Sequence, residues 1–214
     1  MTSCPDVMRT RATSMACAQD VPGVMAAGRG MCVLVGLALG ALPSVSAAQG
    51  RFADAKMYAQ AGATSLQGDA THAMSMGVMV PSRLLKDVRR DAGPLTLHWD
   101  LWGGHWRSHH ADGTTGGYSQ LGALMAWRYQ PAGPRSPWFL EAGLGGSVTD
   151  GLYHSGERRF STAFQFTEVL AMGYRFGPEK AYEVSLRVQH FSNAGIKKPN
   201  PGENFMSLRF SLPW

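Results

Sequence analysis

Hydrophobic and polar residues alternate along most of the chain after residue 48. Leu95, Leu97, Trp99 and Leu101, for example, each have a polar or charged residue between them and the next. An alternation of period two places successive side chains on opposite faces of a β-strand. Turn-forming residues separate the alternating stretches. They predict eight strands, over residues 56–65, 72–80, 95–104, 117–129, 137–148, 161–176, 181–192 and 204–213.

The two faces of these predicted strands differ in character. In 204–213, Met206 and Leu208 share one face, whereas Ser207 and Arg209 share the other. Alternating segments of about ten residues are typical of transmembrane β-barrels, with the apolar face toward lipid and the polar face inside. The alternative is a soluble sandwich or lipocalin-type barrel, whose apolar face points inward.

Aromatic residues near the predicted strand ends favour the membrane alternative, because such barrels carry aromatic girdles at both interfaces. The last alternating strand also closes on an aromatic residue. We therefore predict an all-β fold, an eight-stranded antiparallel transmembrane β-barrel of the outer-membrane type, over 49–214. The aromatic residues are Trp99, Trp127, Tyr129, Trp138, Tyr174, Phe176 and Trp214.

The N-terminal region has the pattern of a secretory signal peptide. A basic residue precedes an apolar run over 31–42, and small residues up to Ala48 follow a proline. The run is too short for a helical membrane span, which needs about 20 apolar residues. We predict that 1–48 is an N-terminal extension and signal peptide, cleaved after Ala47 or Ala48.

Composition narrows the chemistry that the remaining chain can perform. All three cysteines, Cys4, Cys17 and Cys32, lie before residue 48, so the cleaved chain would have no disulfide, cysteine metal site or thiol nucleophile. The net charge of +5 suits a partner that carries phosphates. The sequence has no basic helix, phosphate-binding glycine loop or RNA-binding motif, so we expect no nucleic-acid partner.

The end of the seventh predicted strand offers candidate catalytic residues. His190 and Ser192 lie two positions apart, so they share one face with Cα atoms roughly 6.5 Å apart. A polar loop then leads to Glu203, just before the last strand. A nucleophile, a base and an orienting acid are the parts of a serine esterase. Ser192 would attack, His190 would take and return its proton, and Glu203 would orient the imidazole.

The parity of the strand places these residues on the barrel exterior. His190 and Ser192 share the parity of Leu186 and Val188, which is the apolar face. The substrate would then be a lipid ester reached from the outer leaflet. The alternative is an interfacial histidine followed by an ordinary loop. An oxyanion would need donors, for which the candidates are Asn200, Asn193 and a backbone N–H near Gly195.

The run from His190 to Asn200 closely resembles the C-terminal signature of PagL-type lipid A 3-O-deacylases. The resemblance covers about the last 30 residues. It implies a serine hydrolase site on the outside of an eight-stranded outer-membrane barrel, which removes the ester-linked acyl chain at the 3-position of lipid A. It assigns His190 as base, Ser192 as nucleophile and Asn200 to the oxyanion hole. The family's acid lies just past the glycine that matches Gly202, and this assigns Glu203.

We therefore predict a lipid A 3-O-deacylase of the Ser-His-Glu type in the bacterial outer membrane, with its site toward the outer leaflet. Its partners would be lipid A or lipopolysaccharide and outer-membrane lipid, and it would need no cofactor and no metal. The sequence leaves a homodimer open. The alternatives are a non-enzymatic barrel, such as an adhesin or a structural protein, and a phospholipase or palmitoyl-transferring barrel.

Three other groups of polar residues carry weaker hypotheses. One predicted loop holds three histidines and an aspartate that could bind a metal, although a solvated polar loop is favoured. Basic residues in other loops could meet lipid A phosphates, with ordinary surface charge as the alternative. Glu168 falls on the lipid-facing side of its predicted strand, and the alternating pattern does not explain a charged residue there. The loop residues are His105, His109, His110 and Asp112, and the basic residues are Lys197, Lys198, Arg158 and Arg159.

Overall fold

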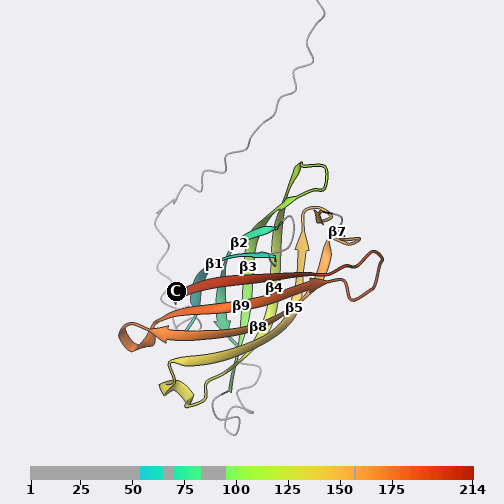
Figure 1. Ribbon diagram of the computed structural model, residues 1–214. Helices are drawn as coiled ribbons and strands as arrows, with labels where there is room; N and C mark the ends of the chain where they lie inside the picture. The colour runs from blue at the N-terminus through green and yellow to red at the C-terminus, as the bar shows by residue number, and fades with distance from the viewer. Residues whose placement is uncertain (1–53, 65–69, 83–94, 157) are drawn as a thin grey trace, which may run out of the picture. The chain divides into compact units, whose positions relative to one another are not determined.

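The chain forms a closed antiparallel β-barrel in the computed structural model (Figure 1). Eight long strands follow one another around the barrel in the order β1-β10-β9-β8-β5-β4-β3-β2. This confirms the predicted fold. The predicted signal peptide over 1–48 lies outside the described residues, which are 54–64, 70–82, 95–156 and 158–214.

The strands agree with the alternating segments of the sequence. No helix in the described part of the chain is long and apolar enough to cross a membrane. The only helices there are short 3-10 turns, η2 (Gly133–Arg135) and η3 (Pro178–Lys180). A two-residue hairpin, β6 (His154–Ser155) with β7 (Arg158–Arg159), lies between β5 and β8. The barrel strands are β1 (Lys56–Thr64), β2 (His72–Pro81), β3 (Leu95–His109), β4 (Thr115–Tyr129), β5 (Trp138–Thr149), β8 (Phe164–Phe176), β9 (Tyr182–Ser192) and β10 (Glu203–Pro213).

The two ends of the barrel are named here by their connections. At the first, the backbone N–H of Trp214 donates to the carbonyl of Ala55 at 3.0 Å, so the start of β1 and the end of β10 meet there. We call it the turn end, because 130–137 and 177–181 are its short described connections. We call the other the loop end, with connections over 110–114, 150–163 and 193–202.

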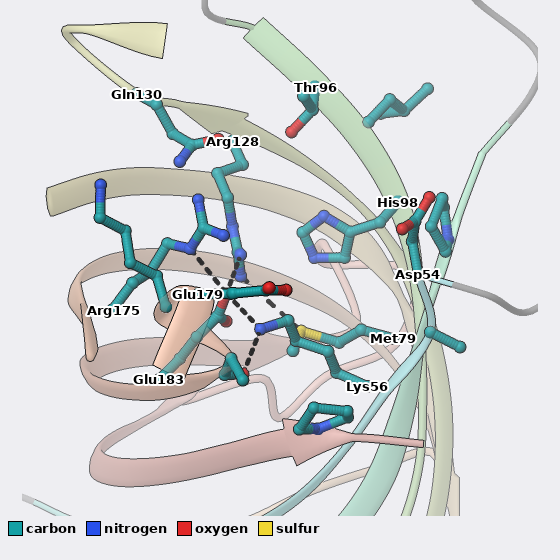
Figure 2. Close-up of a pocket in the computed structure, with 16 residues that line it drawn as sticks. Asp54, Lys56, Met79, Thr96, His98, Arg128, Gln130, Arg175, Glu179 and Glu183 are labelled. Atoms are coloured by element: carbon teal, nitrogen blue, oxygen red, sulfur yellow. Dashed lines mark hydrogen bonds and ion pairs between the residues drawn. The ribbon is translucent and has the colours of Figure 1, made fainter. Parts of the chain in front are cut away.

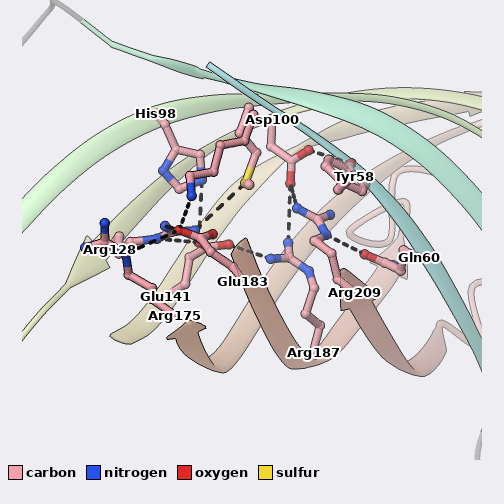
Figure 3. Close-up of polar contacts among 12 residues, drawn as sticks. Tyr58, Gln60, His98, Asp100, Arg128, Glu141, Arg175, Glu183, Arg187 and Arg209 are labelled. Atoms are coloured by element: carbon pink, nitrogen blue, oxygen red, sulfur yellow. Dashed lines mark hydrogen bonds and ion pairs between the residues drawn. The ribbon is translucent and has the colours of Figure 1, made fainter. Parts of the chain in front are cut away.

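Charged side chains fill the barrel interior, as the polar parity predicts (Figure 3). Arg187 is 1% exposed and bridges two buried carboxylates, Asp100 and Glu141. Arg209 donates to the same Asp100 at 2.7 Å. Arg128 pairs with Glu141 and also lies 2.8 Å from a carboxylate oxygen of Glu183. Each buried charge therefore has an opposite charge within reach, which a low-dielectric interior requires.

The outer surface of the barrel is apolar. Met74, Leu121 and Leu170 are each at least 66% exposed there. The predicted girdle residues are also exposed, and Trp138 packs edge-on against Tyr174 with ring centroids 4.8 Å apart. This arrangement excludes the soluble barrel, whose apolar face would point inward.

Aromatic rings fill the interior at the loop end. Trp106 lies between Phe191 and Phe205, with ring centroids 4.8 Å and 4.7 Å away. Tyr153 comes from the loop after β5 and packs on Trp106 at 5.3 Å. This cluster anchors β9 and β10 at the point where the candidate catalytic residues lie.

One predicted loop is much shorter than the sequence suggested. The connection expected over 105–116 shrinks to 110–114, because β3 continues to His109 and β4 begins at Thr115. The predicted strand ended at Gly104, whereas β3 continues through it. The glycine allows close packing of neighbouring strands there, since a Cβ on Gly104 would lie 2.9 Å from the carbonyl oxygen of Met74.

Candidate active site

His190 and Ser192 lie at the loop end of β9, on the outer face of the barrel. Both side chains are half-buried, whereas the intervening Phe191 is 2% exposed and points into the aromatic cluster. Strand alternation therefore forces the histidine and serine outward once the phenylalanine is anchored inside. The predicted outward orientation agrees with this placement.

The imidazole of His190 is held by an amide. Its Nδ1 lies 2.8 Å from Oδ1 of Asn204, and the two residues are direct partners in the β9–β10 register. An amide oxygen only accepts hydrogen bonds, so Nδ1 donates and Nε2 keeps its lone pair. Asn204 thus selects the tautomer in which His190 can act as a base.

Glu203, the predicted acid, faces the other side of the barrel wall. It is 6% exposed and lies opposite the inward-facing Phe191 in the β9–β10 register. One carboxylate oxygen accepts from the hydroxyl of Tyr153 at 3.1 Å, and the other from Arg158 at 3.2 Å. The structure does not bring Glu203 to His190, because β10 begins at Glu203 itself and its first side chain points inward.

Asn204 was not among the predicted site residues, although the alternation of the last strand indicates its position. Met206 and Leu208 define the apolar parity of the last strand, and Asn204 shares it. Glu203 shares the polar parity of Ser207, which points inside. Extending the alternation two residues toward the loop would have identified the amide as the neighbour of His190.

Gly202 gives the imidazole its space. Its φ of +65° is a conformation that side chains rarely adopt, and an added Cβ would lie 2.8 Å from Cε1 of His190. The ring therefore packs directly on the backbone that enters β10. This contact and the Asn204 hydrogen bond together fix the ring position.

Asn193 organises the loop that follows the serine. It is 1% exposed, and its amide nitrogen donates to Ser161 at 3.0 Å and to the carbonyl of Lys197 at 2.9 Å. Its Oδ1 accepts from the backbone N–H of Gly195 at 3.0 Å. The side-chain donors of Asn193 and the N–H of Gly195 are thus engaged in holding the loop.

Asn200 keeps a donor available. Its Oδ1 accepts from the backbone N–H of Asn193 at 3.0 Å, which fixes the orientation of the amide group. Within the described ranges, no hydrogen bond from its Nδ2 is found. Asn200 can therefore present a preorganised N–H to a developing negative charge.

Ser192 itself makes few contacts. Its Oγ accepts a long 3.5 Å hydrogen bond from the backbone N–H of Ala194. Across the described residues, no hydrogen bond joins Ser192 to His190 in this structure. Apo arrangements of this kind are common, since catalytic hydrogen bonds often form only with substrate present.

An apolar groove of about 500 Å³ runs along the outer wall beside the site. Leu170 and Val188 line it and lie two residues along their strands from the row that contains His190. The groove continues past Leu186 and Met172 to Trp127. Its walls suit a hydrocarbon chain, because nearly all of its surface is apolar.

A polar cavity of about 370 Å³ lies at the turn end, away from the site (Figure 2). Lys56, Arg128 and Glu183 line it, and both cations pair with that carboxylate at 3.0 Å and 2.8 Å. These charges are already neutralised by one another. The cavity therefore belongs to the interior network rather than to the candidate active site.

The structure also places the predicted histidine cluster and the basic loop residues. His105 and His109 lie on β3 instead of in a loop, and His110 contacts Thr114 at 2.9 Å. No group of three or more potential metal ligands occurs among the described residues. The four basic loop residues are exposed at the loop end, and their contact with lipid A phosphates stays a prediction.

Comparison with known proteins identifies relatives. A family model described as Lipid A 3-O-deacylase (PagL) matches residues 74–213. The lipid A deacylase PagL of Bordetella bronchiseptica is 30% identical over 146 residues, covering 67% of this chain and 77% of that protein. The Pseudomonas aeruginosa protein of that name is 31% identical over 121 residues, or 56% and 66% of the two chains.

A solved structure agrees with these sequence matches. It is described as the crystal structure of the outer membrane enzyme PagL, and it superposes with a TM-score of 0.56 at 25% identity. The superposition covers 74% of this chain and 99% of the solved one. The similarity therefore extends over the whole barrel and is not confined to the C-terminal motif.

Proposed function

The chain belongs to the PagL family of lipid A 3-O-deacylases, and we propose that it is itself an outer-membrane lipid A 3-O-deacylase that acts through Ser192 and His190. The observation that carries the proposal is the outward placement of a serine and a tautomer-fixed histidine beside an apolar groove. A soluble substrate would not require that placement. A lipid whose ester lies near the membrane surface would.

The reaction follows from the positions of these groups. Oγ of Ser192 attacks the ester carbonyl carbon while Nε2 of His190 takes its proton. The tetrahedral oxyanion meets the free N–H of Asn200. The bond to the sugar oxygen then breaks, and His190 returns the proton to that oxygen. Water attacks the acyl-serine with His190 again as base, which releases the fatty acid and restores Ser192.

Two surfaces support binding of lipid A in particular. The apolar groove begins two residues from His190 and can hold an acyl chain. Lys197, Lys198 and Arg159 are exposed at the loop end, where phosphates of a lipid headgroup would lie. Glu203 supports the site from inside through Tyr153 and Arg158. Formation of a homodimer stays a prediction.

Mass spectrometry of lipid A from cells that express the protein tests this function. We expect loss of one hydroxyacyl unit with the native chain and no loss with Ser192→Ala. The matched control is Ser119→Ala, because Ser119 also lies on the outer face but on β4. Unchanged lipid A with an abundant, folded native barrel would favour a non-enzymatic barrel. A gain in mass would indicate an acyl-transferring one.

A further inference from the structure

Three polar residues form a row across the outer face at the level of the candidate base. In the β8–β9 register Glu168 lies directly opposite His190, and in the β9–β10 register Asn204 lies opposite it on the other side. Directly opposed residues on one face have Cβ atoms about 5 Å apart. A glutamate side chain spans that distance easily.

Asn204 performs only part of the role that a carboxylate has in a serine hydrolase. Its Oδ1 fixes the tautomer of His190 at 2.8 Å. A neutral amide does not provide the negative charge that stabilises an imidazolium once the serine proton has been taken. The site built from Ser192, His190 and Asn204 therefore lacks a negative charge beside the imidazolium.

Glu168 is unusual among the acidic residues of the barrel. Asp100, Glu141, Glu183 and Glu203 are buried, and each pairs with an arginine or lysine. Glu168 is exposed on the outer face, and within the described residues it makes no hydrogen bond or ion pair. Charged groups on the lipid face destabilise such barrels unless they lie near an interface.

Among the residues that the structure describes, no other negative charge lies on the outer face around His190. Val188 and Ser192 flank it on β9, Gly202 packs on its ring, and Asn204 binds its Nδ1. Leu144 lies beyond Glu168 on β5. Glu168 is thus the one charged group that the register of the described strands places beside the imidazole on this face.

We propose that Glu168 is a positioning residue for the deacylation, which stabilises the imidazolium form of His190 from the neighbouring strand. In this arrangement Asn204 and Glu168 together perform the two roles that a single carboxylate has in a serine hydrolase. Asn204 sets the tautomer through Nδ1, and Glu168 provides the charge across the β8–β9 pair. The inference rests on the proposed function and specifies the site that performs it.

The test compares the full-length, folded native protein with Glu168→Gln in detergent micelles containing lipid A. We expect kcat to fall about 10- to 100-fold with KM nearly unchanged, the range that a neighbouring opposite charge gives to a protonated imidazole. The acidic limb of the kcat/KM profile should move to lower pH, because loss of the carboxylate disfavours the protonated ring. A merely structural role would not move that limb.

Three further variants complete the test. Glu179→Gln removes an equal charge from the β8–β9 turn at the turn end and should leave kcat and the profile unchanged. Asn204→Asp, introduced together with Glu168→Gln, restores a carboxylate at Nδ1 and should recover most of the lost kcat. Glu168→Asp, with the same charge on a shorter chain, should retain an intermediate rate.

The outcomes separate this inference from the function on which it rests. A native protein that releases no fatty acid contradicts the function. An active native protein with an equally active Glu168→Gln variant and an unmoved pH profile overturns only the role of Glu168. A change confined to KM would place Glu168 in substrate binding and overturn the role proposed for it. A failure of Asn204→Asp to restore kcat would show that the lost charge is not the cause, and would also overturn that role.

Discussion

The two faces of the barrel wall both carry polar side chains, but these are paired with opposite charges inside and largely unpaired outside. Inside, the carboxylates of Asp100 and Glu141 are both bridged by Arg187, and further cations neutralise them (Figure 3). Outside, His190 has only the amide of Asn204 as a hydrogen-bond partner among the described residues, and Ser192 is nearly free. Saturated charges hold a fold together, whereas a base with a free lone pair beside a hydroxyl can react.

Removal of the base should have the largest effect on catalysis. His190→Gln keeps a polar side chain on the outer face but cannot accept the serine proton. We expect deacylation to fall by at least about 10³-fold while the barrel stays folded. Initial rates of fatty acid release, with heat-dependent gel migration as the folding control, check this. A folded variant that retains more than a tenth of the native rate would contradict the assignment.

Removal of the central interior cation should instead affect stability. Arg187→Ala leaves Asp100 and Glu141 partly unpaired in a buried site, which costs about 3–5 kcal/mol of unfolding free energy. Urea unfolding in micelles measures this, and the fraction that remains folded should deacylate at the native rate. Arg107→Ala, an exposed arginine on β3, is the control and should change stability by less than about 0.5 kcal/mol.

Gly202 lies between the two regions, and its substitution should displace the imidazole. Gly202→Ala places a Cβ against Cε1 of His190, so we expect a loss of rate of about 10- to 100-fold from misplacement of the base. Gly195→Ala is the matched control. Gly195 has a φ of +79°, but an added Cβ there would meet nothing within 4 Å. If both variants lose rate equally, backbone strain and not the contact with His190 is responsible.

Among the residues close to the site, the inward-facing Glu203 should have the smallest effect on catalysis. Glu203→Gln keeps the shape of the side chain and weakens its contacts with Tyr153 and Arg158. We expect less than a tenfold change in kcat and a loss of stability of about 1 kcal/mol. A loss of several hundredfold in kcat would show that Glu203 reaches His190 during turnover.

On the inner side, the pKa of Tyr153 affects how the stability of the barrel depends on pH. Burial raises the pKa of its hydroxyl, with the nearby Glu203 carboxylate adding to the effect. The hydroxyl therefore keeps its proton and donates to Glu203 throughout the neutral and mildly alkaline range. The pKa of Tyr153 is higher in the folded chain than in the unfolded chain. Its contribution to the free energy of unfolding is therefore fully present below about pH 10, and it decreases at higher pH as the unfolded chain loses this proton.

The alternation of the sequence predicted the fold well because a barrel wall imposes it on every strand. One face must meet lipid and the other a charged interior, so each strand carries the same period. The same parity placed His190 and Ser192 outside. It also placed Asn204, the first residue of the predicted last strand, on the outer face. Because Glu203 was left in the loop, its inward parity was not considered, and it was assigned the position beside His190 that Asn204 occupies.

Other features depend on contacts between segments that are distant in sequence. Nothing local shows that Tyr153 reaches Glu203, or that Asn193 is tied to Ser161 across two loops. The pairing of Glu168 with His190 needs the register between β8 and β9, which a pattern of one strand does not contain. The predicted strand was ended at Gly104 because the sequence alone does not show that a glycine there permits a close contact between strands.

Deacylation by three forms of the purified, folded barrel tests whether catalysis takes place on the outer face. Native protein, Ser192→Ala and Glu203→Gln are incubated with lipid A in micelles, and release of the 3-linked acyl chain is followed by mass spectrometry. Catalysis on the outer face predicts release by the native protein, none by Ser192→Ala, and a rate within tenfold of native for Glu203→Gln. Undiminished release by Ser192→Ala would contradict the account.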